Sequence, residues 1–247
     1  MIPLVPIMHG VIDRRMLVNF RVRPEVAAAL LPAPFRPKLA RGWAMAGICL
    51  IRLRAIRPRG FPALLGLGSE NAAHRIAVEW EENGATREGV YIPRRDTSSK
   101  LQSWVGGRIF PGVHHRARYV VTETADEFHL KMEADDGGGN IEVRAKLANW
   151  LEPASVFHSL AEASQFFERG AVGYSATGTP GCCDGLELHT SSWKVEPLKL
   201  LAVQSSFFDD RTKFPAGTIE FDHALLMRGI AHEWRTLPAL HHPLKQS

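Results

Sequence analysis

Glu70 and His74 have the spacing that would place a carboxylate and an imidazole on one face of a β-strand. If the strand begins at Glu70, even-numbered positions share a face, and the other residues on it are Ala72, Ile76, Val78 and Trp80. Burial on such an apolar face raises the pKa of a carboxyl group, and groups with shifted pKa values are candidates for function. In the alternative interpretation, Glu70 only caps a turn in the loop GLGSEN.

His115 is the second candidate for proton transfer. It follows the turn residues Phe110-Pro111-Gly112, and the alternation beyond it places His115 on the more apolar face of a strand, with Ala117 and Tyr119. An imidazole near a buried carboxylate suits general acid–base catalysis near pH 7. The alternative is that His114 and His115 are a pair of surface histidines.

Metal, nucleotide and imine chemistry have weaker support. The sequence has no C-x-x-C, P-loop or G-x-S-x-G motif, and Cys182-Cys183 has the wrong spacing from His189 for ordinary zinc modules. None of the lysines sits at a clearly apolar, inward position, as a Schiff-base lysine needs. We therefore expect no metal and no cofactor.

The composition is that of an ordinary globular protein that binds neither nucleic acids nor membranes. The 247 residues are 45% hydrophobic and 23% charged, and the net charge of +4 comes without a basic cluster. A nearly apolar run, Val26–Phe35, holds two prolines and is too short to span a bilayer. An N-terminus without signal-peptide features and an odd cysteine count favour a reducing cytoplasm.

Strands must position the candidate residues, because two hairpins are legible in the sequence. Arg75–Glu82 alternates polar and apolar residues, Asn83-Gly84 is a strong turn signal, and Arg87–Pro93 is the return strand. The second hairpin joins Phe128–Glu133 to Ile141–Leu147 through a glycine-rich turn. This alternation indicates sheets with one solvated face.

Other segments predict a further strand and three helices. Trp43–Leu53 has the composition of a buried strand, and Glu25–Leu31 that of a short helix. A helix over Leu160–Arg169 has Ser159 as its N-cap, and an apolar stripe predicts another over Phe221–Trp234. The predicted fold class is α+β, dominated by antiparallel strands, in a single domain over residues 1–247.

Several segments resemble a known family. SLAEASQFFERGAVGYS, DGLELHTSSWKVEPLKL, SSFFDD and FDHALLMRGIAHEW are similar to the YqjF-like branch of the acetoacetate decarboxylase-like superfamily. PEVAAALLPAPF and the region from Glu70 to Arg75 resemble its N-terminal half more loosely. Proteins of this branch are mostly of uncharacterised function. The resemblance implies a curved antiparallel β cone or barrel around an interior cavity, with a few outer helices.

The resemblance also bears on mechanism. In acetoacetate decarboxylases, a Gly-Arg-Glu segment leads into a Gly-aromatic-Pro-Lys segment whose lysine forms the Schiff base. Here Gly107-Arg108 matches the first segment, Ile109 replaces its glutamate, and His115 occupies the lysine position. Imidazole cannot form a stable imine with a keto acid, so the resemblance argues against acetoacetate decarboxylase activity.

The leading hypothesis is a cytoplasmic protein whose enclosed cavity binds a small organic molecule such as a keto acid. If it is an enzyme, His115 transfers a proton and Glu70 orients it or the ligand, while Arg108, His114 and His74 contact the substrate. One alternative is a non-catalytic binding or sensor module. A less favoured one is a Schiff-base decarboxylase or aldolase-type enzyme that uses a displaced lysine. The resemblance is compatible with a homo-oligomer.

Overall fold

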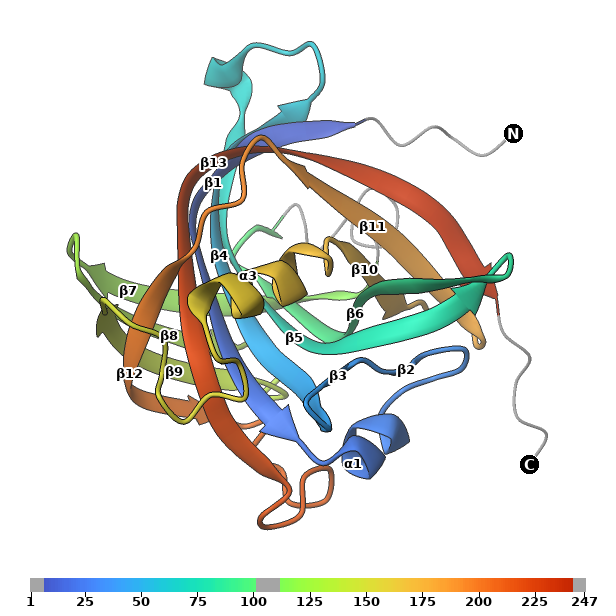
Figure 1. Ribbon diagram of the computed structural model, residues 1–247. Helices are drawn as coiled ribbons and strands as arrows, with labels where there is room; N and C mark the ends of the chain where they lie inside the picture. The colour runs from blue at the N-terminus through green and yellow to red at the C-terminus, as the bar shows by residue number, and fades with distance from the viewer. Residues whose placement is uncertain (1–6, 101–111, 242–247) are drawn as a thin grey trace.

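In the computed structural model, which describes residues 7–100 and 112–241, strands form one 13-stranded sheet that curves back on itself (Figure 1). The strands are β1 (Met8–Val22), β2 (Arg36–Pro37), β3 (Leu39–Ala40), β4 (Trp43–Pro58), β5 (Leu67–Glu82), β6 (Ala85–Thr97), β7 (His114–Glu123), β8 (Glu127–Ala134), β9 (Asn140–Leu147), β10 (Val172–Ala176), β11 (Cys182–Thr190), β12 (Glu196–Ser205) and β13 (Ile219–His241). The helical segments are α1 (Pro24–Ala29), the 3-10 turn η1 (Ala63–Leu65) and α3 (Leu160–Glu168).

The sheet closes into two rings of strands that share one wall. In the first ring, β5 pairs with β6, and the order continues through β7, β8, β9, β12, β13, β1 and β4 back to β5. In the second ring, β6 pairs with β10, which pairs with β11, and β11 pairs with β13. The shared wall is therefore β13, β1, β4, β5 and β6. All these pairings are antiparallel except those of β6 with β7 and with β10.

Over the middle of the shared wall, the strands bury both of their faces. On β1, Met16 packs in one core cluster with Leu130 of β8 and Val143 of β9, which lie across the first ring. The next residue, Leu17, packs in a second cluster with Ala163 and Phe167 of α3. Successive side chains of a strand point to opposite faces. Hence one face of the wall lines the first ring, and the other faces the second ring and α3.

The helix predicted over Phe221–Trp234 is wrong, because this segment lies within β13. Both faces of β13 are covered, and residues from Asp222 to Met227 are all buried. A strand covered on both sides has no polar face, so its apolar residues run together and can imitate a helical stripe. The buried run ends at Met227 and is followed by the exposed residues Arg228 and Gly229, the second of which has a positive φ of 65°.

The other predicted elements are confirmed. Both hairpins form, as β5–β6 and β8–β9, and Asn83 and Gly84 have the positive φ values that the first turn requires. α3 begins after Ser159, whose Oγ accepts a hydrogen bond from the backbone N–H of Glu162 at 3.1 Å. α1 ends at Ala29, slightly before its predicted end.

The fold is β-dominated with few helices, as the sequence predicts. Within residues 7–100 and 112–241, no helix combines the length and apolar character that crossing a bilayer requires.

Candidate functional site

A pocket of about 130 Å³ lies on the second-ring face of the shared wall. Its walls are largely apolar and come from β4, β6, β11 and β13, through Ile51, Leu53, Val90, Ile92, Leu186, Leu188 and Trp234. Three arginines, Arg15, Arg75 and Arg95, also line it, together with Cys49 and His114. We call it the arginine pocket.

The strand register explains why these polar residues meet. Cys49 of β4 pairs with Ala73 of β5, Ala73 pairs with Arg95 of β6, and Arg95 pairs with His114 of β7. Partners in register place their side chains on the same face of a sheet. Arg75 lies two residues beyond Ala73 on β5 and therefore shares that face.

Arg95 is held by one hydrogen bond and keeps an unused donor. Its Nε donates to Ser175 Oγ at 3.0 Å, and its buried Nη2 has no hydrogen-bond partner among the described residues. Burial lowers the pKa of Arg95 to about 10, which still leaves the guanidinium protonated at pH 7.

Arg75 is the most deeply buried of the three arginines. Only 5% of the residue is exposed, one guanidinium nitrogen donates to Asn19 Oδ1, and the group lies 4.8 Å from the centre of the Phe167 ring. Its Nε is buried and finds no partner in the part of the chain that the structure describes. Burial, with a further contribution from the charge of Arg15, lowers the pKa of Arg75 to about 10.

Arg15 completes the positive group. Its Nε donates to Cys49 Sγ at 3.4 Å, and its guanidinium lies 5.7 Å from the centre of the Trp193 ring. Both contacts are to soft or aromatic groups rather than to a carboxylate.

The three charges have no counter-charge among the residues that the structure describes. Within residues 7–100 and 112–241, none of Arg15, Arg75 and Arg95 forms a salt bridge. Asp96 touches the pocket but pairs with Arg94 at 2.7 Å. Residues 1–6, 101–111 and 242–247, which the structure does not describe, contain no aspartate or glutamate. Among the described residues, Asp96 is the one acidic residue that lines the pocket.

His114 is the histidine that lines the arginine pocket. Its Nδ1 lies 3.2 Å from the carbonyl oxygen of Gly112, which assigns the ring proton to Nδ1. Burial lowers the pKa of His114 to about 4, and the nearby charge of Arg95 adds to this effect. The imidazole is therefore neutral at pH 7.

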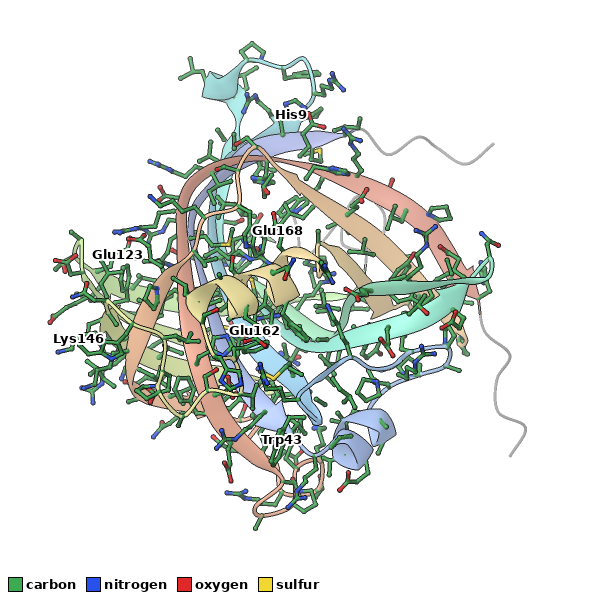
Figure 2. All side chains as sticks on the ribbon, in the orientation of Figure 1. His9, Trp43, Glu123, Lys146, Glu162 and Glu168 are labelled. Carbon is green, nitrogen blue, oxygen red and sulfur yellow. The ribbon has the colours of Figure 1, made fainter. Side chains whose placement is uncertain are left out.

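The two residues predicted to transfer protons lie elsewhere. Neither Glu70 nor His115 is among the described residues that line the arginine pocket. Glu70 does lie on a strand, and it pairs with Arg14 at 2.6 Å and Arg52 at 2.5 Å; both arginines also contact Glu123. In Figure 2, Glu123 is labelled on the first ring, away from α3 with its labelled Glu162 and Glu168.

His115 belongs to a different ion cluster. Its Nδ1 lies 2.7 Å from Asp136, which also binds Arg94 at 2.8 Å, and Arg94 binds the buried Asp96. His115 pairs in register with Asp96, so the two side chains share the face opposite His114. Glu70 and His115 thus share the first-ring face, in separate ion clusters, and the catalytic roles predicted for them stay predictions.

Of the predicted substrate contacts that the structure describes, His114 lines the pocket and His74 does not. His74 is fully buried on the first-ring face, 3.2 Å from Ser205 Oγ and stacked 4.6 Å from the Phe207 ring. Burial lowers its pKa to about 3, so it is a neutral core histidine. Arg108 lies outside the described residues.

Sequence reasoning missed the pocket arginines. The available signal was Arg75, a charge inside the apolar run AAHRIAV. One lysine is more buried than the sequence suggests, because Lys38 is only 9% exposed and pairs with Glu88 at 2.7 Å. Lys38 does not line the arginine pocket, and neither does any other lysine of the described ranges.

Comparison with known sequences gives one family match. The model of the family DUF2071, described as an uncharacterized conserved protein (COG2071), matches residues 12–227. No curated protein matches the chain.

Solved structures similar in fold to this chain include acetoacetate decarboxylases and acetoacetate decarboxylase-like enzymes. An acetoacetate decarboxylase-like enzyme from Sphingomonas wittichii RW1 matches with a TM-score of 0.58 and 12% identity, over 97% of this chain and 93% of the other. Acetoacetate decarboxylase from Legionella pneumophila subsp. pneumophila str. Philadelphia 1 matches with a TM-score of 0.59 and 10% identity, over 98% and 88%. The enduracididine biosynthesis enzyme MppR, complexed with pyruvate, matches with a TM-score of 0.55 and 13% identity, over 96% and 92%. At these identities the likeness concerns the fold alone.

Proposed function

We propose, from the premise that this chain belongs to the DUF2071 family and has an acetoacetate decarboxylase-like fold, that it binds a small organic carboxylate in the arginine pocket. The observation that carries the proposal is the group of three guanidiniums without a counter-charge. Isolated buried charges are costly, so proteins pair them. An external anion would supply the counter-charge that the described residues do not provide.

Size and lining restrict the ligand. A dry cavity of about 150 Å³ is known to hold benzene, so a pocket of about 130 Å³ suits an acid of similar or smaller size. The apolar walls favour a short carbon skeleton, while guanidinium N–H groups recognise the planar carboxylate. The pyruvate complex of MppR supports a 2-keto acid as the ligand class.

The pocket supports binding without an imine. No lysine of the described residues lines it, and the segment 101–111 contains no lysine. An amine nucleophile is therefore missing from both. Borohydride treatment with pyruvate is expected to leave no adduct, and a mass increase at a lysine would support the displaced-lysine alternative.

A second candidate function is proton transfer on the bound acid, with His114 in the role predicted for His115. The neutral His114 imidazole lies beside Arg95 on the pocket wall, where it could accept a proton from the carbon next to a ketone. Exchange of the pyruvate methyl protons for deuterium, followed by NMR, separates this enzyme from a binding or sensor module. His114→Gln is expected to abolish any exchange.

Calorimetry with matched ligands tests the binding proposal. Pyruvate is expected to bind at least tenfold more tightly than pyruvamide, which has the same shape without the charge. Arg95→Met should remove this preference, whereas Arg118→Gln, a change at an exposed arginine, should leave it intact. Equal binding of acid and amide to the unaltered protein, or no binding of either, would overturn the proposal.

A further inference from the structure

Four residues form a straight row across the shared wall and end at the arginine pocket. His223 of β13 pairs with Asn19 of β1, Asn19 pairs with Gly47 of β4, and Gly47 pairs with Arg75 of β5. Asn19 Nδ2 lies 3.0 Å from His223 Nε2, and Asn19 Oδ1 accepts a hydrogen bond from Arg75. Both Asn19 and His223 are fully buried.

Gly47 makes this row possible. Asn19 and Arg75 are two strands apart, and the position between them has no side chain. A Cβ at Gly47 would lie 3.0 Å from Asn19 Oδ1 and 2.6 Å from the carbonyl oxygen of Val18. The glycine therefore lets the asparagine reach across β4 to the guanidinium.

Asp222 fixes the far end of the row. Its carboxylate accepts hydrogen bonds from Ser155 Oγ at 2.6 Å, from the backbone N–H of Val156 at 2.9 Å and from His223 Nδ1 at 2.5 Å. Burial alone would raise the pKa of Asp222, but the hydrogen bonds from His223 and Ser155 hold it below its usual value. An ionised carboxylate only accepts, so the ring proton of His223 is on Nδ1.

The proton on His223 Nδ1 sets the direction of the other hydrogen bonds along the row. With Nδ1 protonated, Nε2 of the neutral ring accepts from the Asn19 amide, which leaves Asn19 Oδ1 facing Arg75. We infer that Asp222 and His223 are positioning residues for the carboxylate site: through Asn19 they fix the orientation in which Arg75 meets the ligand. This inference rests on the function proposed above for the arginine pocket.

The surroundings of His223 keep its ring neutral. The groups that face it are Asp222, Asn19 and Ser155, with the Phe157 and Phe167 rings at 5.3 and 5.5 Å. Burial lowers the pKa of His223; the hydrogen bond to Asp222 opposes this, and the charge of Arg75 adds to it. Protonation would turn Nε2 into a donor, and Asn19 would have to rotate and point its amide hydrogens at Arg75.

Asp222→Asn tests the inference because it keeps the shape of the side chain and reverses the direction of the hydrogen bonds along the row. One position of the new amide must still accept from the Val156 N–H, so its NH₂ group faces His223 Nδ1. The ring proton then moves to Nε2, Asn19 rotates, and Arg75 loses its acceptor. Pyruvate binding is expected to weaken at least tenfold, and binding of pyruvamide less than twofold.

Glu220→Gln is the matched control, since Glu220 lies on the same strand but is half exposed and pairs with Arg21. It should change neither affinity. If Asp222 has a purely structural role, Asp222→Asn should weaken the binding of pyruvate and of pyruvamide to the same extent, and that result would overturn the inference. Unchanged pyruvate binding in this variant would also overturn it.

Nitrogen NMR of labelled histidine gives a readout that does not depend on binding. His223 is expected to carry its proton on Nδ1 in the unaltered protein and on Nε2 in Asp222→Asn. A proton on Nε2 in the unaltered protein would overturn the inference. Absence of pyruvate binding with the expected tautomer would instead count against the proposed function.

Discussion

The two faces of the shared wall differ in whether their arginines have carboxylate partners. On the first-ring face, Arg14 and Arg52 are matched by Glu70 and Glu123, and Arg94 is matched by Asp96 and Asp136. On the second-ring face, Arg15, Arg75 and Arg95 have no acidic partner among the described residues. Matched charges hold strands together, whereas unmatched ones are available to a ligand. Under the function proposed above, one face therefore serves stability and the other serves binding.

Acid stability should depend strongly on the first-ring face, through His74. Because burial lowers the pKa of His74 from about 6.5 to about 3, the unfolded chain binds a proton at a pH where the folded protein does not. The stability that His74 provides is complete above pH 6.5 and is lost as the pH falls towards 3. Between pH 6.5 and 4.5 the loss is about 2–3 kcal/mol.

Urea unfolding at pH 7 and pH 4.5 measures this loss. His74→Gln, which does not titrate, should reduce the difference between the two unfolding free energies by that amount. Saturating pyruvate should leave the reduction unchanged, since His74 lies on the other face. An equal pH dependence in the variant would refute the assignment.

Removing a carboxylate from the Arg14–Arg52–Glu70–Glu123 cluster should lower stability and leave ligand binding unchanged. Glu70→Gln leaves Arg14, which is only 2% exposed, with Glu123 as its one remaining carboxylate. Removal of one partner from a buried pair costs 3–5 kcal/mol, and the second carboxylate reduces this to about 2 kcal/mol. Urea unfolding measures the loss, and calorimetry should show an unchanged pyruvate affinity. Loss of pyruvate affinity with unchanged stability would instead support the predicted role of Glu70 at the ligand site.

The same pattern that predicted the fold did not predict the arginine pocket. Period-two alternation identified the hairpins and correctly grouped Glu70 with His74, because both belong to one face of β5. Alternation does not tell which of two buried faces is hollow, and a shift of one residue exchanges the faces. His114 and His115 differ by that single step. β13 was missed because two covered faces erase the alternation itself.

Removing an unmatched arginine should have the opposite effect on stability. Arg95→Met replaces a buried cation that has one hydrogen bond with an apolar side chain, in a pocket with apolar walls. Replacement of buried charges by hydrophobic groups is often neutral or stabilising. The unfolding free energy without ligand should stay constant or rise by up to about 1 kcal/mol, while the protection that pyruvate gives in a thermal melt should disappear. A loss above about 1 kcal/mol would show that the arginine is matched after all.

His115 gives the smallest expected effect and the sharpest test of the two faces. Its pair with Asp136 joins side chains that are 33% and 42% exposed, and exposed pairs contribute about 0.2–1 kcal/mol. His115→Ala should therefore reduce the unfolding free energy by less than about 1 kcal/mol and leave pyruvate affinity unchanged. The same change at His114, its neighbour on the pocket face, should alter binding or proton exchange instead. If proton exchange on pyruvate requires His115 but not His114, the catalytic face is the first-ring face, and the unmatched arginines need another explanation.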